Sequence, residues 1–115
     1  MPLIRLETTA TLDDLERRSL CGKLSRAAAE IIGKPETYVQ AIVHDRLTMV
    51  HAGADGPTAF VDVRSIGGLS AKVNRALAAR VCQLLGEVGI PGGRVYLNFT
   101  DVPASHWGHD GSTFG

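Results

Sequence analysis

The stretch that decides the fold is residues 33–45, Gly-Lys-Pro-Glu-Thr-Tyr-Val-Gln-Ala-Ile-Val-His-Asp, because the chain contains its pattern twice. Residues 89–101, Gly-Ile-Pro-Gly-Gly-Arg-Val-Tyr-Leu-Asn-Phe-Thr-Asp, repeat that pattern 56 positions later. Each copy begins with a Gly-x-Pro element that ends a helix, continues into an alternating apolar stretch and finishes at an aspartate. This spacing indicates an internal duplication.

Each copy is preceded by the same two patterns. In the first unit, residues 2–8 read as a strand and residues 12–32 as a helix, with Thr8, Thr9 and Thr11 as candidate N-caps. The helix has an apolar stripe, and Gly33 ends it before a strand at 38–45. In the second unit, a strand at 59–64 precedes a helix capped by Ser70 and a strand at 95–101. The stripe residues are Leu12, Leu15, Leu20, Leu24, Ala27, Ala28 and Ile31, then Leu69, Val73, Leu77, Val81, Leu84 and Val88.

These patterns predict an α+β fold made of two pseudo-symmetric β-α-β units. Each unit places its two strands in parallel, so that residues 1–115 form one domain with repeats at about 2–46 and 59–102. Two units side by side give a four-stranded mixed sheet with two helices on one face. The strictly apolar strand residues should lie beneath the helices: Ile4, Leu6, Val39, Val43, Val61, Val63, Val95, Leu97 and Phe99.

The other face of the sheet mixes apolar and polar side chains. It is too apolar for full hydration and too polar for a dry core, so we expect it to face other copies of the same chain. A solvated face with scattered apolar residues is the alternative. The residues concerned are Leu3, Arg5, Tyr38, Gln40, Ile42, Phe60, Asp62, Arg64, Tyr96 and Asn98.

Composition excludes several classes of function. Lysine plus arginine and aspartate plus glutamate number 12 each, which argues against a nucleic-acid or anionic-membrane surface. No apolar run approaches the ~20 residues of a membrane span, and the first residues lack the apolar core of a signal peptide. Two cysteines make no disulfide framework. The expectation is a cytoplasmic protein.

The second residue is a proline at the head of a strand. Pro2 suits the first position of a strand because it has no N–H to donate. Removal of Met1 would make it a free secondary amine, and a free α-amino group has a pKa of about 8 in water. In an apolar pocket such an amine would be a neutral base near pH 7. A Met-Pro start without any chemical role is the simpler interpretation of these two residues alone.

Taken together, the motifs resemble the tautomerase superfamily, in the macrophage migration inhibitory factor group. The resemblance covers nearly the whole chain and rests on the order and spacing of six motifs. These are Met1-Pro2, Gly33-Lys34-Pro35, Ser65-Ile66-Gly67, Asn74-Arg75, Arg94-Val95-Tyr96-Leu97-Asn98 and Ser112-Thr113-Phe114. It implies a homotrimer with sites at the subunit boundaries. It also implies cofactor-free tautomerisation of phenylpyruvate-type or dopachrome-like compounds.

The resemblance also implies a role for individual residues. Pro2 would be the catalytic acid/base, while Lys34 and the backbone N–H of Ile66 would hold the carboxylate of an aromatic 2-oxo acid. Tyr96 and Asn98 would come from the neighbouring subunit, with Asn98 bonding the enol or ketone oxygen. The apolar wall around the ring would be formed by Leu3, Tyr38, Trp107 and Phe114.

This chain also departs from the family pattern. His109 stands where a second aromatic wall is common, and Gly68 stands where some relatives have lysine. If Met1 stays attached, Pro2 is an amide nitrogen and cannot act as a base. The alternative function is therefore a non-catalytic trimeric binding or signalling protein with a vestigial pocket. Decarboxylation or hydrolytic dehalogenation is a third, weaker option, because no second acid accompanies the proposed pocket.

His106, His109 and Asp110 resemble a metal-ligand spacing, but a solvent-exposed tail is favoured.

Overall fold

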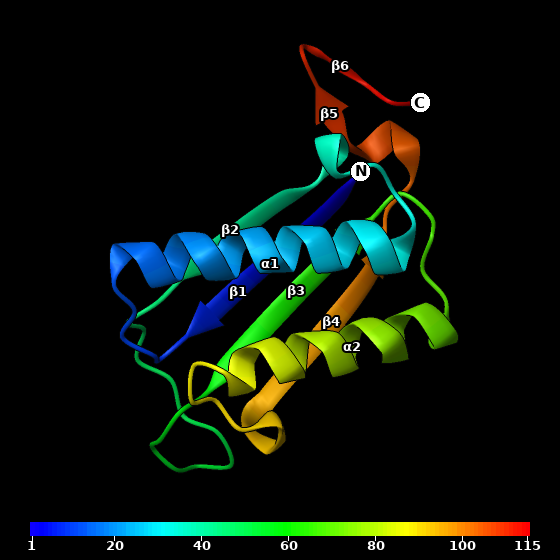
Figure 1. Cartoon of the computed structure of the whole chain (residues 1–115). Helices are drawn as coiled ribbons and strands as arrows, with labels where there is room; N and C mark the ends of the chain where they lie inside the picture. The colour runs from blue at the N-terminus through cyan, green and yellow to red at the C-terminus, as the bar shows by residue number, and fades with distance from the viewer.

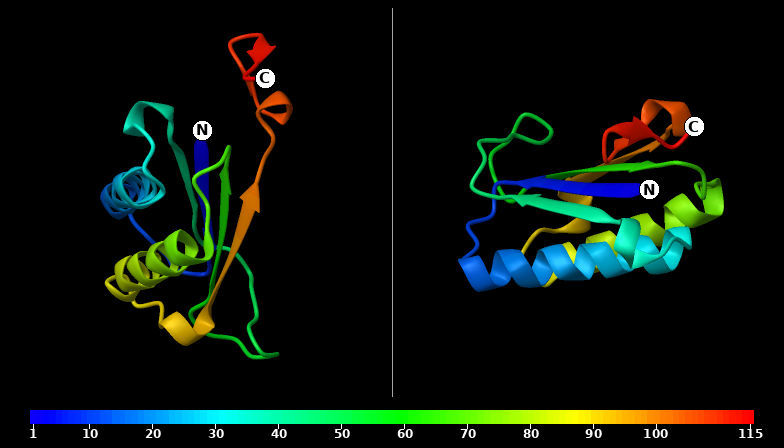
Figure 2. Two further views of the ribbon diagram at one scale, coloured as in Figure 1. Left: turned by 90° about the vertical axis from the view of Figure 1, so that its right-hand side faces the viewer. Right: turned by 90° about the horizontal axis from the view of Figure 1, so that it is seen from above.

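In the computed structural model, which describes residues 1–115, two helices cover one face of a four-stranded sheet (Figures 1 and 2). The C-terminal segment extends beyond the sheet and folds into a small hairpin. The elements are, in chain order, β1 (Pro2–Thr8), α1 (Asp14–Ile32), η1 (Glu36–Tyr38), β2 (Gln40–His44), β3 (Ala59–Ser65), α2 (Ala71–Gly86), η2 (Gly92–Arg94), β4 (Val95–Asp101), η3 (Ala104–His106), β5 (Gly108–His109) and β6 (Ser112–Thr113).

The sheet has the strand order β2-β1-β3-β4. β1 runs parallel to β2, with Ile4 opposite Ala41, and β3 runs parallel to β4, with Val61 opposite Leu97. The two halves meet where β1 and β3 pair antiparallel, with Ile4 opposite Val63. The predicted fold of two β-α-β units around a mixed sheet is therefore confirmed.

The start of α1 differs from the prediction. Its N-cap is Asp13, whose Oδ1 accepts a hydrogen bond from Glu16 N at 2.7 Å, while Asp13 N donates to Glu16 Oε1 at 3.1 Å. This reciprocal capping box satisfies two backbone donors, so Asp13 is preferred over the threonines named from the sequence. Thr8 lies in β1 instead, and its hydroxyl donates to Thr58 O at 2.8 Å.

The end of α1 and the beginning of α2 are as predicted, whereas α2 ends at Gly86, a few residues before the predicted stop at Gly89. Gly33 follows α1 with a φ of 81°, the left-handed conformation that glycine adopts without a Cβ penalty. Ser70 caps α2 by accepting from Val73 N. After α1, strand β2 begins at Gln40 rather than at Tyr38. Tyr38 N donates to Pro35 O at 3.0 Å and so closes the short helix η1.

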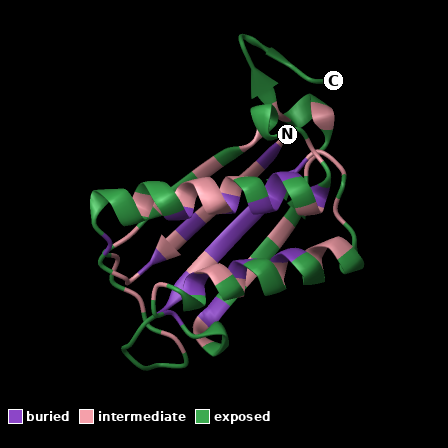
Figure 3. Ribbon diagram, in the orientation of Figure 1, coloured by how far each residue is buried: buried purple, intermediate pink, exposed green.

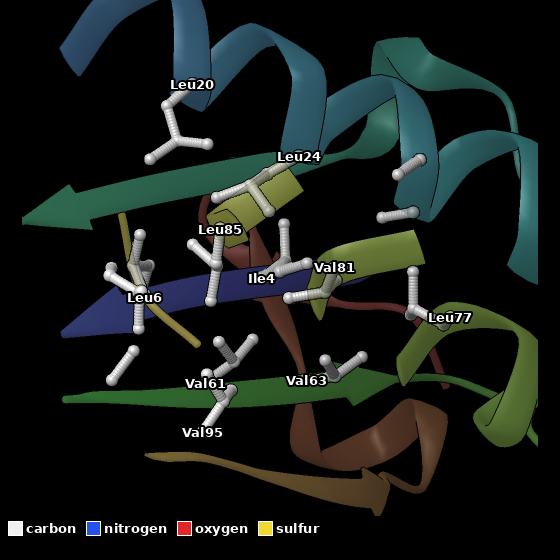
Figure 4. Close-up of a cluster of buried hydrophobic side chains, with 14 of the residues drawn as sticks. Ile4, Leu6, Leu20, Leu24, Val61, Val63, Leu77, Val81, Leu85 and Val95 are labelled. Atoms are coloured by element: carbon white, nitrogen blue, oxygen red, sulfur yellow. The ribbon is translucent and has the colours of Figure 1, made fainter. Parts of the chain in front are cut away.

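The core lies between the sheet and the helices (Figures 3 and 4). Ile4, Leu6, Val61 and Val63 are buried on the helix side of the sheet, as expected. One assignment on the helix stripes was wrong, because Leu15 is 77% exposed. On α2, Leu85 is fully buried four positions after Val81, and Leu84 is partly buried against the core. Figure 4 labels core residues from both layers, which are Leu20, Leu24, Leu77, Val81 and Leu85 on the helices and Ile4, Leu6, Val61, Val63 and Val95 on the strands.

The face of the sheet that the helices leave uncovered is amphipathic. Ile42 and Tyr96 are exposed on the two edge strands β2 and β4. In the middle of the face, Asp62 is only 5% exposed and accepts hydrogen bonds from Arg5 and Arg64.

Candidate functional site

Four segments of the chain meet at one edge of the sheet. Pro2 begins β1 opposite Ser65, the last residue of β3, and Leu3 lies opposite Gln40, the first residue of β2. Because β1 and β2 begin where β3 and β4 end, the N-terminus, the 33–39 connection, the loop after Ser65 and the C-terminal segment come together (Figure 1).

Pro2 lies at this edge on the helix side of the sheet. Its side chain is fully buried, in line with Ile4 and Leu6 along β1. Met1 precedes it, and burial lowers the pKa of the Met1 amino group, with a further contribution from the positive charge of Lys34. The environment of the chain terminus therefore disfavours a protonated amine.

A pocket of about 180 Å³ opens beside Pro2 and brings several predicted residues together. Pro2, Tyr38, Trp107, His109 and Phe114 all contribute to its lining. No aspartate or glutamate lines it, and four of its lining residues are aromatic. The pocket is completed by Met1, Thr37, Val39, Gln40 and Gly108.

The C-terminal hairpin supplies one wall of this pocket. Phe114 N donates to Trp107 O at 3.2 Å, which closes the segment on itself around the short β5–β6 pairing. The rings of His109 and Phe114 stack with centroids 5.6 Å apart and planes 9° from parallel. His109, the residue at which this chain departs from the family pattern, is therefore part of the pocket wall.

Lys34 and Ile66 border the same edge but do not line the pocket. The loop that carries Ile66 is held at Gly67, whose N–H donates to Asp101 Oδ1 at 2.9 Å and whose carbonyl accepts from the Ser65 hydroxyl at 2.7 Å. Gly68 packs against the end of α1 so closely that an added Cβ would lie 3.3 Å from Lys34 Cε. The loop and the Lys34 side chain are therefore in contact.

Three predicted residues lie elsewhere in the protomer. Leu3 faces the uncovered side of the sheet and lines an adjoining pocket of about 340 Å³. Asn98 is exposed in the middle of β4. Tyr96 is 68% exposed near the start of that strand, where its ring lies 4.9 Å from the ring of His51. Their assignment to a shared site remains a prediction.

Sequence reasoning missed the role of Asp101 in holding the loop. The available signal was the duplication, because Asp45 occupies the corresponding position and also accepts a backbone hydrogen bond, from Leu12 N at 2.9 Å.

His106, His109 and Asp110 form no cluster of three metal-binding side chains. No helix has the length and apolar character needed to cross a membrane.

A larger cavity of about 530 Å³ lies at the opposite edge of the sheet. It is lined by residues 9–11, 47–49, 55–57 and 88–90. None of the predicted site residues contributes to it, so its size alone does not make it the candidate site.

Comparison with known proteins gives one consistent result. The family model described as macrophage migration inhibitory factor (MIF) matches residues 1–115. A macrophage migration inhibitory factor homolog of Brugia malayi is 36% identical over 100% of both chains. The solved structure of a homologue from Prochlorococcus marinus has a TM-score of 0.93 at 38% identity, covering 98% of this chain and 99% of that one. The Entamoeba histolytica MIF-like protein also has a TM-score of 0.93, at 32% identity, with 98% of each chain covered. A more distant structure, Pt0534 inactivated by 2-oxo-3-pentynoate, has a TM-score of 0.83 at 25% identity over 95% of this chain and 93% of that one.

Proposed function

Because the chain belongs to the macrophage migration inhibitory factor family, we propose that it is a cofactor-independent keto–enol tautomerase of small aromatic 2-oxo acids. Pro2, freed by removal of Met1, is the acid/base. The observation that carries the proposal is the position of Pro2, buried at a pocket with an aromatic wall and no acidic side chain.

The pocket environment suits a proline amine to this reaction. A 1,3-proton shift needs one group that takes a proton from carbon or oxygen and returns it to the other atom. Burial and the charge of Lys34 already lower the pKa of the amine at Met1. The same two influences would keep the Pro2 amine of the processed chain neutral near pH 7, because both disfavour a positive charge.

The substrate carboxylate and ring each have a partner at this edge. Lys34 and the N–H of Ile66 hold the carboxylate beside the loop after Ser65. The ring lies against the wall that Tyr38, Trp107 and Phe114 form. Phenylpyruvate fits both requirements. Pt0534 supports the acid class, since its inactivator is a 2-oxo acid whose conjugated alkyne is open to attack by a nucleophile.

The complete site requires a second subunit in this proposal. Tyr96 and Asn98 are exposed on the edge strand β4, away from the pocket of their own chain. A homotrimer would bring the neighbour's Asn98 to the substrate oxygen, where one hydrogen bond to the developing enolate is worth about 3 kcal/mol. The exposed apolar side chains of Ile42 and Tyr96 give a reason for such an assembly.

The test is an enol–keto assay with phenylpyruvate on protein whose first residue is identified by mass spectrometry. Protein that begins at Pro2 should convert phenylpyruvate, and the Pro2→Gly variant should lose most of the rate because glycine supplies a primary, more mobile amine. Protein that retains Met1 should be nearly inactive. A processed chain no faster than the Pro2→Gly variant would refute the enzyme and favour the binding protein.

A further inference from the structure

A second pocket adjoins the candidate site across β1. The two pockets share Gln40, Trp107 and Gly108, while Pro2 lines one and Leu3 lines the other. They differ in charge, because the second pocket also has Arg64 and His106 in its lining. Neither lining contains an aspartate or glutamate, so every ionisable side chain facing the joint space is a base or a phenol.

Arg64 is held in place by a buried carboxylate behind it. Its Nε and Nη2 both lie 3.2 Å from Asp62 Oδ2, and Asp62 is almost fully buried. The same oxygen also lies 3.1 Å from Arg5 Nη2. Asp62 is thus shared between two guanidinium groups, while half of the Arg64 side chain is exposed in the single subunit, on the sheet face that we expect to meet other copies of the chain. This leaves Nη1 free to bind an anion at an orientation that the Asp62 contact fixes.

We propose that Arg64, with His106, forms a second anion subsite beside the Pro2 pocket. This inference rests on the proposed function and narrows its substrate class to aromatic 2-oxo acids that carry another acidic group on the ring. The 2-oxo acid end lies at Pro2, the ring lies against Trp107 between the two pockets, and the second anion reaches Arg64. Arg64 would be a specificity-determining residue that takes no part in proton transfer.

Binding can be measured without catalysis, because Trp107 is the only tryptophan of the chain and lines both pockets. Its fluorescence is titrated with 4-carboxyphenylacetate and with phenylacetate, which differ by the second anion. The Arg64→Gln variant should bind the diacid about tenfold more weakly and the monoacid within about twofold of the parent, since about 1.4 kcal/mol of one charge-assisted contact is lost.

Two further variants control this measurement. Arg18→Gln removes the same charge from an exposed ion pair with Asp14 on α1 and should leave both affinities unchanged. Arg64→Lys keeps the charge and should restore part of the diacid affinity. Loss of fold is not expected in Arg64→Gln, because Asp62 keeps Arg5 as its partner. Equal weakening of both acids, or no weakening of either, would overturn the subsite.

Kinetics then separate this inference from the proposed function. With (4-carboxyphenyl)pyruvate, Arg64→Gln should raise KM about tenfold at unchanged kcat, while the constants for phenylpyruvate stay within about twofold. If Arg64→Gln changes KM for neither substrate, the protein is a tautomerase that lacks the subsite. A protein that binds the diacid through Arg64 but converts neither substrate would keep the subsite and refute the tautomerase.

Discussion

The position of the Lys34 side chain depends on its neighbour Gly68, which has no side chain. Gly68 has a φ of 79°, and a Cβ there would lie 2.8 Å from Ile32 Cγ2 as well as close to Lys34 Cε. The lysine side chain therefore rests on the surface of the loop at Gly68.

Gly68→Ala should destabilise the protein and weaken binding of 2-oxo acids. The overlap with Ile32 and the left-handed backbone together should cost about 2–4 kcal/mol of unfolding free energy. Displacement of Lys34 should raise KM for phenylpyruvate more than it lowers kcat. Urea denaturation and steady-state kinetics measure the two effects.

The matched control is Gly67→Ala. Gly67 has a φ of 68°, yet an added Cβ would meet nothing within 4 Å. It should therefore lose only the cost of the left-handed conformation, about 1 kcal/mol. Equal losses in the two variants would mean that Gly68 is required for its backbone conformation and not for its contact with Lys34.

The Met1 amino group gives protein that retains Met1 a distinctive pH dependence of stability. Its pKa is lowered from 8.0 in the folded chain, so the unfolded chain binds more protons just below pH 8.0. The unfolding free energy should therefore rise with pH through this range and level off above it. Nα-acetylated protein is the comparison, since acetylation removes the charge in both states. The same rise in both forms would show that other groups cause it.

At the level of elements, Asp45 joins the end of β2 to the start of α1. Its Oδ2 accepts from Leu12 N at 2.9 Å and from Arg17 Nη1 at 3.3 Å. The Leu12 hydrogen bond, assisted by the charge of Arg17, holds the pKa of Asp45 below its ordinary value near 3.8. The carboxylate stabilises the fold above that pH, and this stabilisation is lost as the pH falls through the lower pKa of the folded state.

Asp45→Asn should therefore be less stable than the parent at pH 7, and the difference should shrink as the pH falls below about 3.8. Thermal unfolding across that range tests this. Asp14→Asn, which removes a largely exposed carboxylate from the first turn of the same helix, should change stability little at either pH. A constant difference for Asp45→Asn at every pH would contradict the charge-based account.

Periodicity was sufficient to predict the regular elements, and local capping was harder to predict. The strands and both helix stops follow from alternation and from Gly33 and Gly89, each within a few residues. The start of α1 was misplaced because the threonines before it satisfy the same composition rule as Asp13. Only the partner Glu16, three positions later, distinguishes the true cap. The β5–β6 hairpin has strands of two residues, too short for any periodic signal.

At the scale of the whole molecule, part of the candidate site could be predicted, because the directions of the strands determine which connecting segments come together. Pro2, Tyr38, Trp107, His109 and Phe114 line one pocket. Leu3 could not join them in one protomer, because successive strand residues point to opposite faces. Tyr96 and Asn98 depend on how copies of the chain assemble, which the periodicity of one chain does not encode.

The trimer predicts that Asn98→Ala lowers kcat about 10²-fold without changing assembly. Sedimentation equilibrium of both proteins should give three times the subunit mass of 12.2 kDa. Thr100→Ala, another exposed change on β4, should keep full activity. A variant at Asn98 that sediments as a monomer would make this residue an interface contact and leave its place in the site without support.

The large cavity at the far edge of the sheet is the duplicated counterpart of the Pro2 edge. At the offset of 56 residues, Thr58 corresponds to Pro2 and Ile90 to Lys34, and Ile90 and residues 9–11 line that cavity. Thr58 lies inside the chain, and its N–H donates to Thr9 Oγ1 at 3.0 Å. The duplication thus left a cavity at each end of the sheet, and only the one at Pro2 offers a nitrogen that an electrophile can label. Alkylation of processed protein with an acetylenic 2-oxo acid should accordingly place an adduct on Pro2 and none on the residues of the far cavity, as peptide mapping by mass spectrometry would show.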